Sequence, residues 1–177
     1  MTEKVKLSRR SALKAVGAGL IVAGTGAGGM VFGVNNAWAM EAVNLDADTF
    51  ATLVQMSRDT YPHERLEDKF YAAAVSGLDG AAKDDAALKT MLTDGVTALN
   101  KAAVDLKAAS YAGMSSEDDR IALLKSMEAD PFFQKIRGNL VTGIYNNKEV
   151  WPLFGYEGAS AEKGGYIERG FNDINWL

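Results

Sequence analysis

The chain has 177 residues, of which 47% are hydrophobic and 24% charged, and its formal net charge at pH 7 is −4. This length and balance are typical of one globular domain and are too small for a nucleotide-binding domain joined to a separate substrate domain. The sequence has no cysteine and one histidine, His63, which excludes disulfides, cysteine-held zinc or iron–sulfur sites, thioether-attached haem, cysteine nucleophiles and zinc sites with two histidines.

The N-terminal part of the chain has the charge pattern of an export signal. The first 14 residues carry five positive charges and one negative charge, and no further charged residue occurs before Glu41. The uncharged run at 15–34 contains seven glycines, so it is long but only mildly hydrophobic. A basic start followed by such a run is typical of a secretory signal peptide.

Small residues follow this run at the positions that a signal peptidase reads, Ala37 and Ala39. We therefore predict an export signal over residues 1–39, cleaved before Met40, and a single mature domain over residues 40–177. Twenty uncharged residues are also long enough to span a bilayer, so the alternative is an uncleaved membrane anchor. The seven glycines weaken membrane insertion and favour the cleaved signal.

The basic region resembles a twin-arginine translocation signal at Ser8, Arg9, Arg10, Leu13 and Lys14. It departs from the usual pattern at Ala12, where such signals mostly have Phe. The resemblance implies that the twin-arginine translocase exports this chain to the periplasm in a folded state.

The mature domain is acidic, with 14 Lys and Arg against 22 Asp and Glu, a net charge of −8. It has no run of basic residues, which argues against nucleic acid as a partner. It also has few side chains that could hold a cofactor, although twin-arginine export normally serves folded, cofactor-loaded proteins. The combination points to a bound protein partner that needs this route.

Apolar residues spaced by three and four predict an all-α fold, a small bundle of about five helices. We expect helices at about 46–61, 70–79, 84–109, 116–127 and 131–145, and no strand in residues 40–177. Side chains that cap helix N-termini stand at Asp46 or Asp48, at Ser115 or Ser116, and at Asp130, the last followed by Pro131. Met91 and Met127 fall on apolar faces, where packing in the core is expected.

The last 27 residues are irregular and aromatic. Glycines recur through this tail, so it cannot form a regular helix, and it is too aromatic to stay solvated. Its large side chains must be buried either in grooves of the chain's own bundle or against another protein. The candidate partner interface consists of Trp151, Phe154, Tyr156, Tyr166, Phe171 and Trp176.

No residue is predicted to be catalytic. His63 follows Pro62 in a polar connection, where a lone histidine is mostly a cap or a surface hydrogen-bonding group. The acidic groups at 84–85 and 117–119 lack the spaced oxygen ligands of a cation-binding loop, and we interpret them as helix starts. No metal or cofactor site is therefore expected in this chain.

Aromatic, Gly and Pro positions form a recognisable pattern in Asp130-Pro131-Phe132-Phe133, Ile136-Arg137, Thr142-Gly143-Ile144-Tyr145, Val150-Trp151-Pro152-Leu153-Phe154-Gly155-Tyr156-Glu157-Gly158, Gly164-Gly165-Tyr166 and Gly170-Phe171-Asn172-Asp173-Ile174-Asn175-Trp176. This pattern resembles the gluconate 2-dehydrogenase subunit 3 family. The resemblance covers most of the mature chain from about residue 46, and its specific part is residues 130–176. Tyr61-Pro62-His63 adds weaker support upstream.

This resemblance implies a non-catalytic small subunit of a periplasmic or membrane-associated dehydrogenase complex. The large subunit of such complexes is a flavoprotein of the glucose-methanol-choline type, which carries FAD, oxidises a sugar, sugar acid or polyol, and often passes electrons to a multihaem cytochrome subunit. The small subunit would assist folding of the flavoprotein and provide its export signal. The alternative is an independent exported or membrane-anchored helical scaffold protein.

Overall fold

The structure, a computed structural model, describes residues 20–23, 30–33, 39–168 and 171. The predicted all-α bundle is confirmed. Its five α-helices are α2 (Ala47–Thr60), α3 (Asp68–Ala81), α4 (Ala86–Asp105), α5 (Glu117–Ser126) and α6 (Pro131–Tyr145).

The helices begin at capping side chains. The Asp46 carboxylate accepts a hydrogen bond from the Thr49 amide at 2.8 Å, and Ser116 and Asp130 cap α5 and α6 in the same way. Each cap satisfies an amide that the helix itself leaves without an acceptor. Helix α4 is shorter than predicted because it ends where Lys107 adopts a left-handed φ of 68°.

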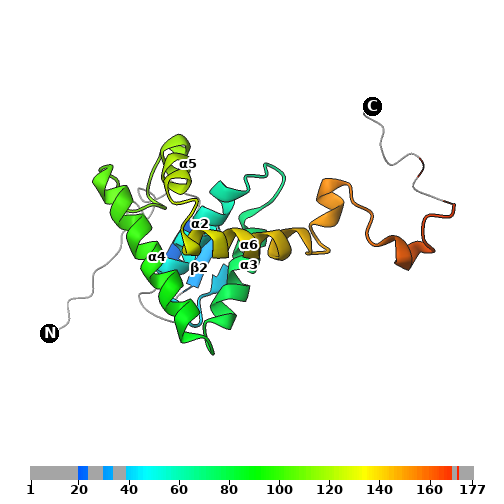
Figure 1. The fold of residues 1–177 in the computed structure, drawn as a ribbon, viewed down its shortest axis with the longest axis horizontal. Helices are drawn as coiled ribbons and strands as arrows, with labels where there is room; N and C mark the ends of the chain where they lie inside the picture. Colours follow the sequence, from blue (N-terminus) through cyan, green and yellow to red (C-terminus); the bar gives the residue numbers. More distant parts are fainter. Residues whose placement is uncertain (1–19, 24–29, 34–38, 169–170, 172–177) are drawn as a thin grey trace.

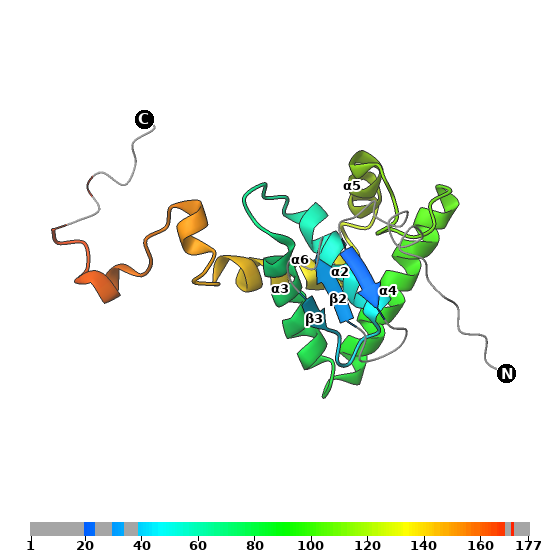
Figure 2. The same ribbon diagram turned by 180° about the vertical axis from the view of Figure 1, so that it is seen from behind.

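Helix α2 lies at the centre of the molecule. It contacts the four other helices, with α6 on one side (Figure 1) and a small sheet on the opposite side (Figure 2). Eleven of its 14 residues are buried, including polar side chains such as Gln55 and Asp59. The sequence suggests a narrow apolar stripe here, but packing on several sides buries nearly the whole helix.

The sequence patterns do not predict the sheet, and the expectation of no strand in residues 40–177 is wrong at Met40 and Glu41, which lie in a strand. Strands β1 (Leu20–Ala23), β2 (Met30–Gly33) and β3 (Ala39–Glu41) form an antiparallel sheet in that order. β1 and β2 contact α2, and β3 contacts α3. Glycines divide this part of the sequence into apolar runs that are too short for helices but long enough to pair as strands.

A buried carboxylate ties the chain after β3 to the bundle. Asp79, near the C-terminal end of α3, accepts hydrogen bonds from the backbone amides of Val43, Asn44 and Leu45 at 2.7–3.0 Å. The sequence suggests only a helix end at this position. These three bonds place the sheet beside α3 before α2 begins.

The core contains most of the apolar residues that the helical spacing predicts, but Met91, Val141 and Leu106 are exceptions, with 37%, 49% and 55% of their surfaces exposed. The buried stripe of α4 passes beside Met91, through Leu88, Leu92, Val96, Leu99 and Ala103. Met127 is partly buried against the core, as expected. Among the described residues, no helix combines the length and hydropathy required to cross a membrane.

Candidate functional site

The aromatic tail leaves the bundle after α6. It turns through two short 3₁₀ helices, η3 (Trp151–Phe154) and η4 (Ser160–Lys163), and both views show it extending away from the other helices (Figures 1 and 2). The predicted irregular structure is confirmed, and Gly155 and Gly164 end the two turns with positive φ of 75° and 82°. This conformation is easily available only to glycine.

Four predicted interface residues are exposed in the tail. The exposed fractions are 42% for Phe154, 48% for Tyr156, 57% for Tyr166 and 81% for Phe171. The sequence left two options for these rings, burial in grooves of their own bundle or burial against another protein. The structure does not bury them in the bundle. Trp176 lies outside the described residues.

Trp151 differs from the other tail aromatics because it is half-buried against its own chain. Its indole Nε1 donates to the backbone oxygen of Tyr145 at 2.7 Å, and its ring packs edge-on against Tyr156 at a centroid distance of 5.1 Å. The neighbouring Val150 is fully buried. Trp151 therefore anchors the base of the tail to the end of α6.

His63 joins the loop after α2 to the end of α6 and to η3. Its Nε2 lies 2.8 Å from the Tyr145 hydroxyl, and its ring packs edge-on against Phe154 at 5.0 Å. Partial burial lowers the pKa of His63 from its usual 6.5, because desolvation disfavours the charged imidazolium. The expected hydrogen-bonding role is confirmed.

A buried polar network lies on the other side of the same loop. The Asp59 carboxylate accepts hydrogen bonds from Arg120 Nε at 2.8 Å and Nη2 at 3.2 Å, from the Tyr111 hydroxyl at 2.7 Å and from Gln55 Nε2 at 3.0 Å. Arg120 Nη1 donates to the backbone oxygen of Met114. Burial and the adjacent Asp59 carboxylate raise the pKa of Tyr111, so its hydroxyl remains a donor.

The local sequence around Asp59 contains no signal that would predict this network. Asp59 looks like a solvated residue near the end of α2, and its partners Tyr111 and Arg120 are 52 and 61 residues away. Gln55, one turn earlier on the same helix, is the only local partner among the described residues. One such pair cannot indicate that the face is buried.

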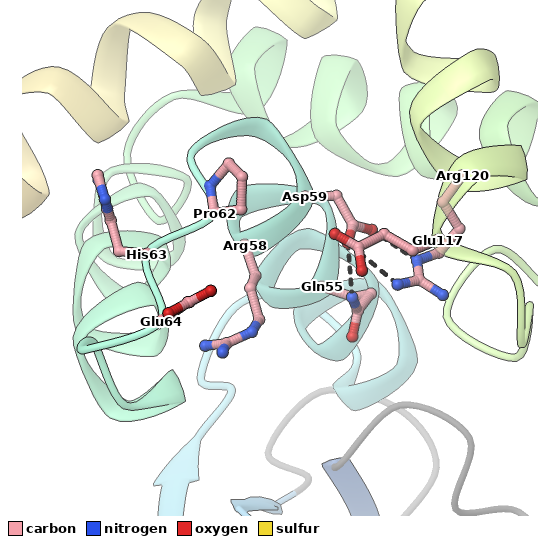
Figure 3. Close-up of a pocket in the computed structure, with 8 residues that line it drawn as sticks. All are labelled: Gln55, Arg58, Asp59, Pro62, His63, Glu64, Glu117 and Arg120. Carbon is pink, nitrogen blue, oxygen red and sulfur yellow. Dashed lines mark hydrogen bonds and ion pairs between the residues drawn. The ribbon is translucent and has the colours of Figure 1, made fainter.

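A cavity of about 410 Å³ opens beside the network. Figure 3 shows its lining, which comes from α2, from the loop after α2 and from α5: Gln55, Arg58, Asp59, Pro62, His63, Glu64, Glu117 and Arg120. The lining is mainly polar and charged. It brings together residues that the sequence analysis treats separately, the loop around His63 and the acidic start of α5.

The other predicted site residues belong to the predicted export signal. Ser8, Arg9, Arg10, Leu13, Lys14 and Ala37 lie outside the described residues, while Ala39 and Met40 lie in β3. The predicted cleavage bond is therefore inside a strand.

When the chain is compared with protein-family models, with curated proteins and with solved structures, nothing matches.

Proposed function

We propose that this chain is the non-catalytic small subunit of a periplasmic or membrane-associated dehydrogenase complex. Its partner would be a flavoprotein of the glucose-methanol-choline type that holds FAD and oxidises a sugar, sugar acid or polyol. The small subunit would assist folding of this partner and supply the twin-arginine signal that exports both chains. In this proposal the chemistry belongs to the partner, and some complexes would add a multihaem cytochrome subunit.

The observation that carries the proposal is the exposed aromatic tail. Phe154, Tyr156, Tyr166 and Phe171 present large rings on a segment that extends from the bundle. Large apolar rings gain free energy when they are buried against another protein, and Tyr and Trp are common in the energetic centres of protein interfaces. A second protein would bury this surface.

The sequence supports the same partner class. The resemblance to the gluconate 2-dehydrogenase subunit 3 family is strongest over 130–176, the region that contains α6 and the tail. The twin-arginine signal fits a complex whose flavin is inserted before export. A mature domain with a net charge of −8 also argues for a protein partner rather than nucleic acid.

Co-purification tests the proposal. The tagged full-length chain is co-expressed with a flavoprotein dehydrogenase of the proposed class and recovered from the periplasm, where we expect a stable complex with a flavin absorption spectrum. Replacing Tyr156 and Tyr166 by Ser should reduce recovery of the flavoprotein at least tenfold, because hot-spot aromatics cost upward of about 2 kcal/mol in binding.

The matched control replaces Val104 and Leu106 by Ser. These residues are at the C-terminal end of α4, away from the tail, and their exposed fractions of 54% and 55% are comparable with those of the two tyrosines. We expect the control variant to bind the flavoprotein normally. Equal loss in both variants, or no complex with the unmodified chain, would contradict the proposed docking.

A further inference from the structure

The predicted cleavage bond, between Ala39 and Met40, is held in a paired strand. Ala39 pairs with Phe32 and Met40 with Val31 of β2, and β3 also contacts α3 (Figure 2). The Met40 side chain is half-buried and packs against the hydrophobic core. Proteases cut exposed, locally unfolded segments most readily, because the chain must give up its own hydrogen bonds to enter an active site. The folded chain therefore does not present this bond to a protease.

A buried carboxylate fixes the chain immediately after β3. Asp79 is 2% exposed, and its two carboxylate oxygens accept hydrogen bonds from the backbone amides of residues 43–45 at 2.7–3.0 Å. The Asn44 side chain adds a fourth bond, from Nδ2 to the backbone oxygen of Asp79 at 2.8 Å. No cation forms an ion pair with Asp79 in the part of the chain that the structure describes, so the three amides compensate its charge. We call this arrangement the Asp79 clamp.

The clamp limits how far β3 can move. Met40 is three residues from the first clamped amide, that of Val43, and three extended residues span at most about 11 Å. Ala42 and Leu45 add to the restraint because they are buried, with 0% and 1% of their surface exposed. Opening the strand far enough for a protease therefore requires that the clamp be released and that this stretch leave the core.

We propose that the Asp79 clamp protects the N-terminal segment from processing while the chain is folded. Hydrolysis, in which water adds across the bond and leaves a carboxylate on Ala39 and an amino group on Met40, would occur only after β3 has been released. The choice of this bond rests on the proposed export signal, whereas the protection is a property of the fold. A chain that folds before it is processed would keep β1 and β2 on α2.

Limited proteolysis of the full-length chain tests the protection. The chain is made in a membrane-free translation system and digested with endoproteinase Glu-C, which cuts after Glu41 at the exposed end of β3, and mass spectrometry follows each product. Asp79→Asn keeps the size of the side chain but removes its charge, and cleavage after Glu41 should become at least about tenfold faster. Asn44→Ala removes one neutral hydrogen bond and should accelerate it about fivefold. Cleavage after Glu64, in the exposed loop after α2, is the internal control and should be unchanged in both variants.

Urea distinguishes release of the segment from unfolding of the whole domain. Local opening exposes little surface, so the cleavage rate in Asp79→Asn should hardly change with urea below the unfolding transition, which circular dichroism locates. Asn44→Ala is measured in the same way and decides the question if Asp79→Asn does not fold. The proposal is overturned if the rate rises with urea in parallel with global unfolding, or if the folded variants are cut after Glu41 no faster than the unmodified chain.

Purified signal peptidase tests the bond itself. A synthetic peptide of residues 1–50, which contains the whole predicted signal, gives the rate for an unprotected bond. We expect the folded chain to be cut between Ala39 and Met40 at least about a hundredfold more slowly than this peptide. Equal rates would overturn the protection. If the peptide is not cut, the cleavage site of the export proposal is wrong, while the rates with Glu-C still decide whether the clamp protects the segment.

Discussion

At the residue scale, Asp59 and Arg120 form the most buried ion pair among the described residues. Both side chains are nearly buried, with 3% and 10% of their surface exposed, so each has lost most of its hydration. If one partner is removed, the charge of the other is left uncompensated, because little water can reach it at this buried position. Tyr111, Gln55 and the Met114 carbonyl complete the hydrogen bonds and connect α2 to α5 and to the loop before it.

We expect Asp59→Asn to destabilise the chain by about 3–5 kcal/mol, because it leaves the buried Arg120 without a counter-ion. Tyr111→Phe should cost only about 1–2 kcal/mol, since Arg120 still satisfies the same carboxylate oxygen. Urea denaturation measures both. The exposed Asp94→Asn on α4 is the control and should change stability by less than about 0.5 kcal/mol. A cost for Asp59→Asn as small as this control would show that the pair is solvated.

His63 provides a pH-dependent readout of how the tail is attached. NMR titration should give a His63 pKa below 6.5, because burial disfavours the imidazolium. Phe154→Ala removes a ring that packs 5.0 Å from the imidazole, so it should return the pKa toward 6.5. A depressed folded-state pKa also means that His63 contributes stability above pH 6.5 and that this stability is lost as the pH falls below it. A pKa at or above 6.5 would contradict this packing.

At the element scale, the crossing of α3 and α6 depends on a missing side chain. A Cβ atom built at Gly143 would lie 2.8 Å from the Ala74 Cβ and 3.2 Å from its Cα, so the two helices meet almost at their backbones. Asn139, one turn earlier on α6, donates to the backbone oxygen of Ala74 at 2.9 Å. The crossing holds α6 in place, and α6 carries the tail.

Two glycine substitutions on α6 separate this contact from helix propensity. Gly143→Ala should destabilise the chain by about 1–3 kcal/mol, because the added methyl group presses on the α3 backbone. Gly138→Ala adds the same group where nothing lies within 4 Å, and it should stabilise the chain by about 0.5–1 kcal/mol through the lower flexibility of the unfolded state. Thermal unfolding compares the two. Stabilisation by both substitutions would show that the helices can separate without cost.

At the scale of the whole molecule, the predicted signal and the folded domain overlap. β1 and β2 lie within residues 1–39 and contact α2, and the predicted cleavage bond between Ala39 and Met40 lies within β3. Cleavage there would remove two strands and uncover one side of the central helix. Under the export proposal, the stability of this chain would therefore depend on the order of folding, export and cleavage.

The export proposal is tested by changing Arg9 and Arg10 together to Lys. The positive charge is unchanged, but the paired guanidinium groups of the signal are lost, so we expect both this chain and its flavoprotein partner to remain in the cytoplasm. Cell fractionation followed by immunoblotting measures both proteins. Continued appearance of the partner in the periplasm, while this chain is retained, would contradict shared export.

Local sequence patterns were enough to predict the helix class, the helix starts near Asp46, Ser116 and Asp130, and the irregular tail, while the structure identified Asp46 and Ser116 as the caps. Spacing and capping are short-range properties, so nearby residues suffice to predict them. Tertiary packing, in contrast, buries Asp59 with Arg120, places Glu64 and Glu117 in the lining of one cavity and leaves Met91 exposed. These outcomes depend on which helix face packs against which neighbour, and that is settled by contacts between residues far apart in the chain.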